Sequence, residues 1–125
     1  MALKVKLEVT PDKYLPHRYA GASGDFNPIH IDQEFAREVG LPSNILHGLY
    51  SMAQVARACT KAAGGDPRSL RRLSVQFRGM GFPEQAITVA GQERESRDGT
   101  VILDLHAEQG GKKIIKNGEA ELRGL

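Results

Sequence analysis

Apolar and polar residues alternate with the period of two that is typical of a β-strand in several parts of the chain. The clearest run is 101–107, where Val101, Leu103 and Leu105 alternate with polar side chains. Other runs of the same kind cover residues 3–9, 70–78, 87–95 and a last stretch from Gly111 to about Leu122. We therefore predict five strands. The last three follow one another through short glycine-containing turns, which favours an antiparallel meander.

The segment between the first strand and the other four contains apolar residues with helical spacing. Between Leu49 and Ala63 the apolar residues recur three and four positions apart, and Gly64-Gly65 ends the segment. Many of these residues are small, so a neighbouring layer can approach closely. We expect a long central helix wrapped by a curved antiparallel sheet, which is an α+β fold. A shorter helix is expected from Asp32, as its N-cap, through Val39.

Composition limits the kind of protein that this chain forms. Its 125 residues, 40% hydrophobic and 26% charged, predict one globular domain over residues 1–125. A net charge of +2 and the absence of Trp argue against a nucleic-acid partner. No apolar run approaches the roughly 20 residues of a membrane span. The single cysteine, Cys59, fits a reducing compartment, so we expect a cytoplasmic protein.

An open sheet of five strands leaves two edges whose backbone groups have no partner. Pairing such edges across a two-fold axis covers them with a second copy of the same chain. We therefore expect a homodimer or a dimer of dimers.

The run Tyr19-Ala-Gly-Ala-Ser-Gly-Asp-Phe-Asn-Pro-Ile-His30 is the main candidate for a site. It is rich in turn-forming residues, and Pro28 disfavours the helical region for the residue before it. We expect a rigid loop here rather than an ordinary helix or strand. Asp25 and His30 are suited to general acid–base catalysis, and Asn27 can orient them through its amide.

Two other interpretations of this run compete with acid–base chemistry. Taken singly, Asp25 and Asn27 are ordinary turn caps and His30 is an ordinary core histidine. A calcium loop needs Gly at its sixth position and Glu at its twelfth, where His30 and Ala36 stand. No paired His or Cys spacing supports zinc. We expect no metal site.

His47-Gly48 directly precedes the long helix. The free N–H groups at a helix N-terminus can bind a developing oxyanion, and Gly48 lets a carbonyl approach the backbone closely. By itself this pair is better explained as an ordinary helix cap. Beside an acid–base pair, it predicts a site that holds a thioester carbonyl and reacts at the adjacent carbons.

The run from Tyr19 to Asp32, followed by Ile45-Leu-His-Gly-Leu49, closely resembles the MaoC-like dehydratases, which include the (R)-specific enoyl-CoA hydratases. The resemblance is strong over residues 19–56 and looser from there to the C-terminus. It implies a hot-dog fold, dimers with sites near the subunit interface, and reversible syn addition of water to trans-2-enoyl thioesters. It implies no cofactor, because coenzyme A or an acyl carrier protein arrives as part of the substrate.

The resemblance also implies roles for individual residues. Asp25 and His30 match the pair that activates water and transfers the proton, and Asn27 matches the residue that orients this pair. Gly48 matches the backbone donor to the thioester carbonyl. The positions that shape the substrate pocket are matched by Ser23 and His47.

Two alternative functions remain open from the sequence. A hot-dog thioesterase would use Asp25 to activate water against the carbonyl carbon itself. A non-catalytic subunit would bind acyl thioesters or complete a heterodimer. The segment Gly81-Phe-Pro-Glu-Gln85 also departs from the family's usual turn, which leaves the acyl chain length and the assembly undetermined.

Overall fold

The computed structural model describes residues 2–124, which form a five-stranded sheet, a long helix and three short helices. In chain order the elements are β1 (Lys4–Val9), α1 (Leu15–Ser23), α2 (Pro28–Ile31), α3 (Gln33–Glu38), α4 (Gly48–Ala62), a 3-10 turn (Pro67–Ser69), β2 (Leu70–Phe77), β3 (Ile87–Arg97), β4 (Thr100–Gln109) and β5 (Lys112–Arg123). Each of the five predicted strands and the predicted long helix is present, with ends that differ by a few residues.

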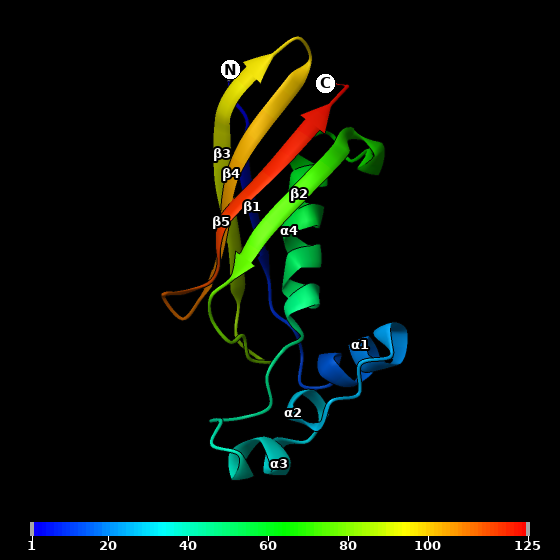
Figure 1. Cartoon of the computed structure of the whole chain (residues 1–125), viewed down its shortest axis with the longest axis vertical. Coiled ribbons are helices and arrows are strands. Elements are labelled where there is room, and N and C mark those ends of the chain that lie inside the picture. The colour runs from blue at the N-terminus through cyan, green and yellow to red at the C-terminus, as the bar shows by residue number, and fades with distance from the viewer. Residues whose placement is uncertain (1, 125) are drawn as a thin grey trace.

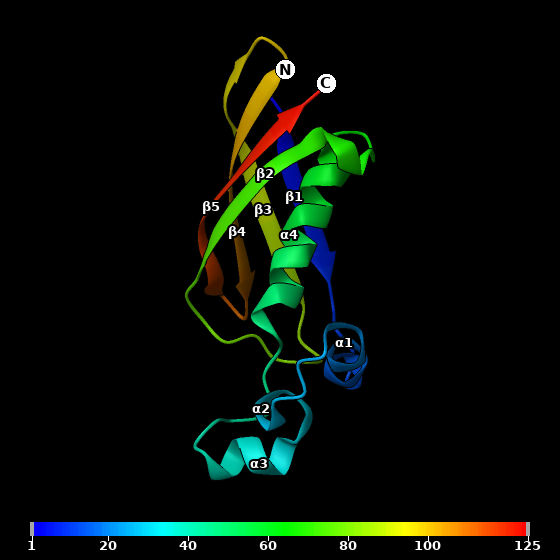
Figure 2. The same ribbon diagram turned by 45° about the vertical axis from the view of Figure 1, so that its right-hand side comes forward.

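The sheet has the strand order β1-β3-β4-β5-β2, and every neighbouring pair is antiparallel. The meander predicted from the alternating pattern is confirmed as β3-β4-β5. Figures 1 and 2 show that the sheet curves around α4, with β1 and β2 at its two edges. The predicted α+β arrangement of a sheet wrapped around a central helix is therefore correct.

The core lies between α4 and the concave face of the sheet. On α4 the small residues Ala58 and Cys59 are at most 1% exposed, and Val55 is fully buried. They belong to one apolar cluster that includes Leu103 and Ile115 of the sheet. Small side chains let the helix lie close to the strands, and burial of their apolar surface stabilises the fold.

Two glycines allow three central strands to pass one another closely. Gly91 of β3 and Gly118 of β5 flank Leu105 of β4 in the hydrogen-bonded register. A Cβ added to Gly91 would lie 2.7 Å from Leu105 Cδ2, and one added to Gly118 would lie 2.9 Å from the Leu105 carbonyl oxygen. Glycine at these positions leaves room for the backbone of the next strand.

The helices α1, α2 and α3 gather beyond the end of the sheet at which α4 begins (Figures 1 and 2). The prediction that residues 19–30 avoid helical structure was wrong at both ends, because α1 runs to Ser23 and α2 begins at Pro28. Proline is well tolerated in the first turn of a helix, so Pro28 begins α2 after Asn27, whose ψ of 127° lies outside the helical region. The predicted cap of the next helix is confirmed, since Asp32 Oδ1 accepts a hydrogen bond from Phe35 N–H at 3.0 Å.

Within residues 2–124, no helix combines the length and the apolar character that crossing a membrane requires.

Candidate active site

A four-residue loop between α1 and α2, residues 24–27, carries Asp25; we call it the Asp25 loop. Gly24 ends α1 with a left-handed φ of 81°. The Ser23 hydroxyl then accepts a hydrogen bond from Asp25 N–H at 3.2 Å, and Asp25 Oδ1 accepts one from Asn27 N–H at 3.2 Å. The Asn27 side chain in turn caps the first turn of α2. Local side-chain-to-backbone bonds of this kind hold a short loop in one conformation.

Asp25 and His30 face one another across this loop. The distance from Asp25 Oδ2 to His30 Nε2 is 3.7 Å, and the Asp25 side chain is 53% exposed, whereas that of His30 is 11% exposed. His30 Nδ1 lies 2.8 Å from the carbonyl oxygen of Ile45. Because a carbonyl only accepts, Nδ1 carries the proton, and Nε2 of the neutral ring is free to accept one. A separation of 3.7 Å exceeds a direct hydrogen bond and leaves both atoms available to one small molecule.

His47 lies behind this pair, and its side chain is almost completely buried. Its Nε2–H donates to the backbone carbonyl of Asp25 at 3.0 Å. Its ring stacks on that of His30 with 4.0 Å between centroids, and Tyr19 packs on it at 4.7 Å. His47 Nδ1 is the one buried side-chain nitrogen or oxygen without a hydrogen-bond partner among residues 2–124. The structure thus connects His47 to both candidate acid–base residues.

Gly48 begins α4 directly after His47. The first N–H groups of a helix have no acceptor within the helix, so the start of α4 offers hydrogen-bond donors and the positive end of its dipole. A Cβ at Gly48 would lie 3.2 Å from two carbons of the Phe77 ring. The absence of a side chain therefore lets Phe77, at the end of β2, lie against the start of the helix.

A cavity of about 170 Å³ contains both His30 and Gly48 in its wall. The rest of the wall is almost entirely apolar or glycine, with Ser51 of α4 as the remaining polar residue. It is formed by Ile45, Leu46, Phe77, Gly79, Met80, Gly81, Ile114 and Ile115. A largely apolar pocket with a few polar groups at one end is the usual form of a small-molecule site.

Asp25, His30 and His47 also form a cluster whose potential metal-ligand atoms lie within 4.8 Å of one another. His30 Nδ1 and His47 Nε2 are already bonded to carbonyl oxygens. The lone pairs of the two remaining ring nitrogens lie in the ring planes, and the two rings stack at an interplanar angle of 24°. Each ring thus has one nitrogen left for a further bond, and the Asp25 carboxylate is the third group of the cluster. The expectation that no metal binds here stays a prediction.

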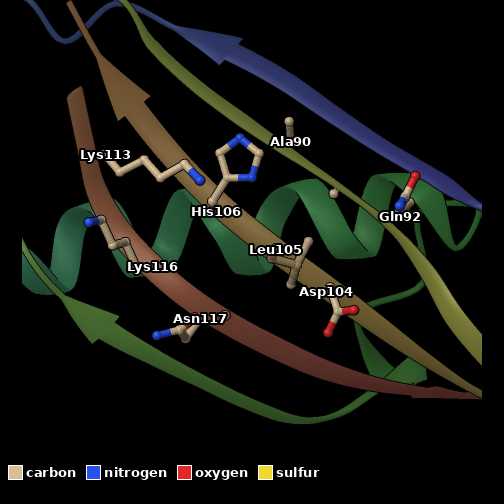
Figure 3. Close-up of a pocket in the computed structure, with 10 residues that line it drawn as sticks. Ala90, Gln92, Asp104, Leu105, His106, Lys113, Lys116 and Asn117 are labelled. Carbon is tan, nitrogen blue, oxygen red and sulfur yellow. The ribbon is translucent and has the colours of Figure 1, made fainter. Parts of the chain in front are cut away.

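A larger hollow of about 720 Å³ lies on the face of the sheet that points away from α4. Figure 3 shows His106, Lys113 and Lys116 along one side of it, with Asp104 and Gln92 toward the other end. None of the predicted site residues lines it. The smaller cavity beside α4 is therefore the candidate active site.

The structure brings together Asp25, His30, Gly48 and His47, and it places Ser23 and Asn27 in the hydrogen bonds that shape the Asp25 loop. Sequence reasoning missed the backbone carbonyl of Ile45 and the side chain of Asn44, whose Nδ2 donates to the His30 carbonyl at 2.8 Å. Both contacts join residues about fifteen positions apart through backbone atoms. The residue types along a sequence do not predict such a contact.

Comparisons with known proteins agree with this geometry. Residues 2–114 match the family model described as a MaoC-like domain. The chain is 38% identical over 107 residues to a fatty acid synthase subunit beta of Aspergillus oryzae, a match that covers 83% of this chain and 5% of the relative. It is 33% identical over 104 residues to the peroxisomal enoyl-CoA hydratase 2 of Arabidopsis thaliana, covering 82% of this chain and 32% of that protein. The chain thus spans about a third or less of these curated relatives.

Solved structures show the same fold. A structure described as the (R)-hydratase from A. caviae involved in PHA biosynthesis superposes with a TM-score of 0.88 at 22% identity, over 98% of this chain and 94% of that one. A structure described as a MaoC-like dehydratase superposes with a TM-score of 0.90 at 28% identity, over 100% of this chain and 40% of that one. The expected hot-dog fold is confirmed, and the chain belongs to the MaoC-like domain family.

Proposed function

We propose that this protein catalyses the (R)-specific hydration of trans-2-enoyl thioesters to 3-hydroxyacyl thioesters, and the reverse dehydration. The observation that carries the proposal is the position of His30 and Gly48 in the wall of one apolar cavity, with Asp25 facing His30. The likeness to an enoyl-CoA hydratase 2 supports this reaction class. The acyl group arrives on coenzyme A or on an acyl carrier protein, and no further cofactor takes part.

One water molecule placed between Asp25 and His30 supplies the nucleophile. With 3.7 Å between Asp25 Oδ2 and His30 Nε2, a water oxygen can hydrogen-bond to both atoms. As its oxygen bonds to C3 of the enoyl group, the pair accepts one of its protons. The C2–C3 π electrons move toward the thioester carbonyl, and the pair then delivers a proton to C2. The backbone N–H of Asn27 donates to the Asp25 carboxylate, and the Ser23 hydroxyl accepts from the backbone N–H of Asp25, so both bonds fix the position of this residue.

The start of α4 stabilises the negative charge that develops on the thioester oxygen. Gly48 N–H and the helix dipole are fixed before the reaction begins, so little reorganisation is needed when charge appears. Loss of one oxyanion donor costs about 10²–10³ in rate in enzymes where it has been measured. Gly48 is therefore assigned to the carbonyl, and the Asp25–His30 pair to the two carbons beyond it.

We also propose a homodimer and a cytoplasmic location. Both β1 and β2 are edge strands of the sheet, so one side of each strand has no neighbouring strand within the protomer. A second copy that pairs with one of these edges would give its backbone groups hydrogen-bond partners. The buried free thiol of Cys59 fits a reducing compartment.

Mixing the purified protein with crotonyl-CoA tests the reaction. Hydration removes the ultraviolet absorbance of the conjugated thioester and yields (R)-3-hydroxybutyryl-CoA. Release of free coenzyme A thiol instead would identify a thioesterase. Absence of both changes with crotonyl-CoA and with longer, branched and carrier-bound enoyl thioesters would contradict the proposal and favour a non-catalytic subunit.

A further inference from the structure

We infer that the cavity selects short acyl chains, with about four to six carbons including the thioester carbonyl, and that Ile114 sets this limit. The inference rests on the function proposed above, because it places the acyl group between Gly48 and His30. It adds the substrate class and a specificity-determining residue to that function.

The size of the cavity provides the first argument. Its volume is about 170 Å³, and an engineered apolar cavity of about 150 Å³ is known to hold benzene, which has six carbons. Both residues that define the reacting end, His30 and Gly48, line this same volume. The carbonyl and the enoyl carbons therefore occupy part of it, and only a short tail fits beyond C3.

The two ends of the cavity differ in exposure. Phe77 is 47% exposed and Met80 is 48% exposed, so this side opens to the surface and admits the thioester with its carrier. Leu46 and Ile114 are each 4% exposed and Ile115 is fully buried. The acyl tail points toward this buried side, which is closed by packed core residues.

Backbone hydrogen bonds hold the closed side in place. Leu46 N–H donates to the Gly81 carbonyl at 2.8 Å, and Arg78 N–H donates to the Ile114 carbonyl at 2.9 Å. Together they fasten the segment 78–81 to the segment before α4 and to β5. A longer chain would have to break these bonds in order to enlarge the cavity, and the bond between the buried residues Leu46 and Gly81 is costly to lose without a new partner.

Ile114 also contacts this segment with its side chain. A Cβ built on Gly81 would lie 3.1 Å from Leu46 Cδ1 and 3.5 Å from Ile114 Cδ1. A Cβ on Gly79 would lie 2.9 Å from the Lys113 carbonyl and 3.6 Å from Ile114 Cγ2. The glycines therefore lie against Ile114 with little space to spare. Removing the terminal methyl of Ile114 is the smallest change that lengthens the cavity.

Binding of saturated acyl-CoA thioesters, which the enzyme cannot hydrate, measures the cavity separately from the reaction. Calorimetric titration with butyryl-, hexanoyl-, octanoyl- and decanoyl-CoA gives the affinity for each length. Each CH₂ that enters an apolar site raises affinity about fourfold, so we expect about a fifteenfold gain from butyryl to hexanoyl. We expect no further gain at octanoyl or decanoyl.

The variant Ile114→Val should move this limit, whereas Ile87→Val should not. Both variants remove one methyl from a buried isoleucine, but Ile87 lies on β3 and does not line the cavity. In Ile114→Val the cavity has room for one more CH₂ of the acyl chain. We therefore expect the ratio of octanoyl-CoA affinity to hexanoyl-CoA affinity to rise roughly fourfold. The ratio in Ile87→Val should equal that of the parent protein.

Affinity that continues to rise through decanoyl-CoA, or that does not depend on chain length, would overturn the size limit. An equal ratio in the two valine variants would overturn the role of Ile114. A limit at hexanoyl together with no hydration of crotonyl-CoA or trans-2-hexenoyl-CoA would leave the cavity inference standing and refute the proposed reaction.

Discussion

The sheet with α4 and the segment 24–48 are held together by different forces. In the first region, fully buried apolar side chains such as Val55 and Leu103 pack against one another. In the second, the main contacts are hydrogen bonds, and His30, Asn44 and His47 are three of the six buried polar residues identified among residues 2–124. Apolar packing stabilises the fold, whereas the polar network orients reactive groups. Substitutions in the two regions should therefore separate stability from activity.

The largest effect is expected from Asp25→Asn. This change keeps the shape of the side chain and removes its charge and basicity, so hydration should slow by about 10²–10⁴, the usual contribution of a general acid–base group. Because the Asp25 side chain is half exposed, the melting temperature should change little. Stopped-flow absorbance with crotonyl-CoA and a thermal melt measure the two quantities.

Asp98→Asn, in the turn between β3 and β4, is the matched control and should leave both quantities unchanged. Unfolding of Asp25→Asn at the assay temperature would make Asp25 a structural residue and contradict its proposed role.

Gly91→Ala should show the opposite behaviour. Its new methyl group would lie 2.7 Å from Leu105 Cδ2 and would press on the backbone of β4, which overpacks the sheet. We expect a loss of about 3 kcal/mol in the free energy of unfolding, measured by urea titration. The same substitution at Gly21 in α1 meets no atom within 4 Å and should stabilise the protein slightly. Equal free energies of unfolding for Gly91→Ala and Gly21→Ala would show that β4 leaves room for a methyl group at Gly91.

Gln109→Leu tests the segment 82–85, which directly follows Gly81 of the cavity wall. The buried Gln109 amide accepts from Phe82 N–H at 2.7 Å and donates to the carbonyls of Phe82 at 2.8 Å and Gln85 at 3.1 Å. Leucine leaves these backbone groups unpaired, so we expect a loss of about 2 kcal/mol in stability. Chemical denaturation should show no comparable loss for Gln92→Leu, an exposed glutamine on β3. A stability loss as small as that of Gln92→Leu would show that water replaces the Gln109 amide.

His47 is a positioning residue, and its substitution should affect turnover more than binding. His47→Phe keeps a ring against His30 but loses the donor to the Asp25 carbonyl, so we expect kcat to fall about tenfold with little change in KM. His47→Gln, which restores an N–H donor, should recover part of this loss. Equal kcat in the two variants would show that the hydrogen bond is unimportant.

Cys59 should be unreactive in the folded protein. Burial raises the pKa of its thiol to about 11, so only about 0.1% is thiolate at pH 8, and the side chain is not exposed. A thiol reagent should modify it only in denaturant. The neutral buried thiol stabilises the fold fully below the pKa of the unfolded thiol, about 8.5, and this contribution is lost as pH rises through 11. Rapid labelling of the native protein at pH 8 would contradict the buried position.

The sequence predicted the first region better than the second. Val101, Leu103 and Leu105 are buried, and their period-two spacing in the sequence indicates that they face the core from one strand. The strands and their meander could therefore be inferred directly from the sequence. The spacing within residues 49–63 located α4 in the same way. The helical end of α1 was missed because Ala20-Gly-Ala-Ser23 has little apolar pattern of its own.

The candidate site was predictable in its residues but not in its contacts. Asp25 and His30 belong to a short motif, and the resemblance of this motif to a known family made them candidates. The burial of His47, its stacking on His30 and the Ile45 carbonyl that sets the His30 tautomer depend on how separate segments meet. Such contacts involve backbone atoms or single side chains, which leave no periodic signal in a sequence.

A crystal structure of the protein with bound (R)-3-hydroxybutyryl-CoA tests the account most directly. We predict the thioester oxygen within hydrogen-bond distance of Gly48 N–H, and the 3-hydroxyl between Asp25 Oδ2 and His30 Nε2. The C4 methyl should point toward Ile114. An acyl group bound away from His30, for example in the hollow lined by His106 and Lys116, would contradict the proposed site.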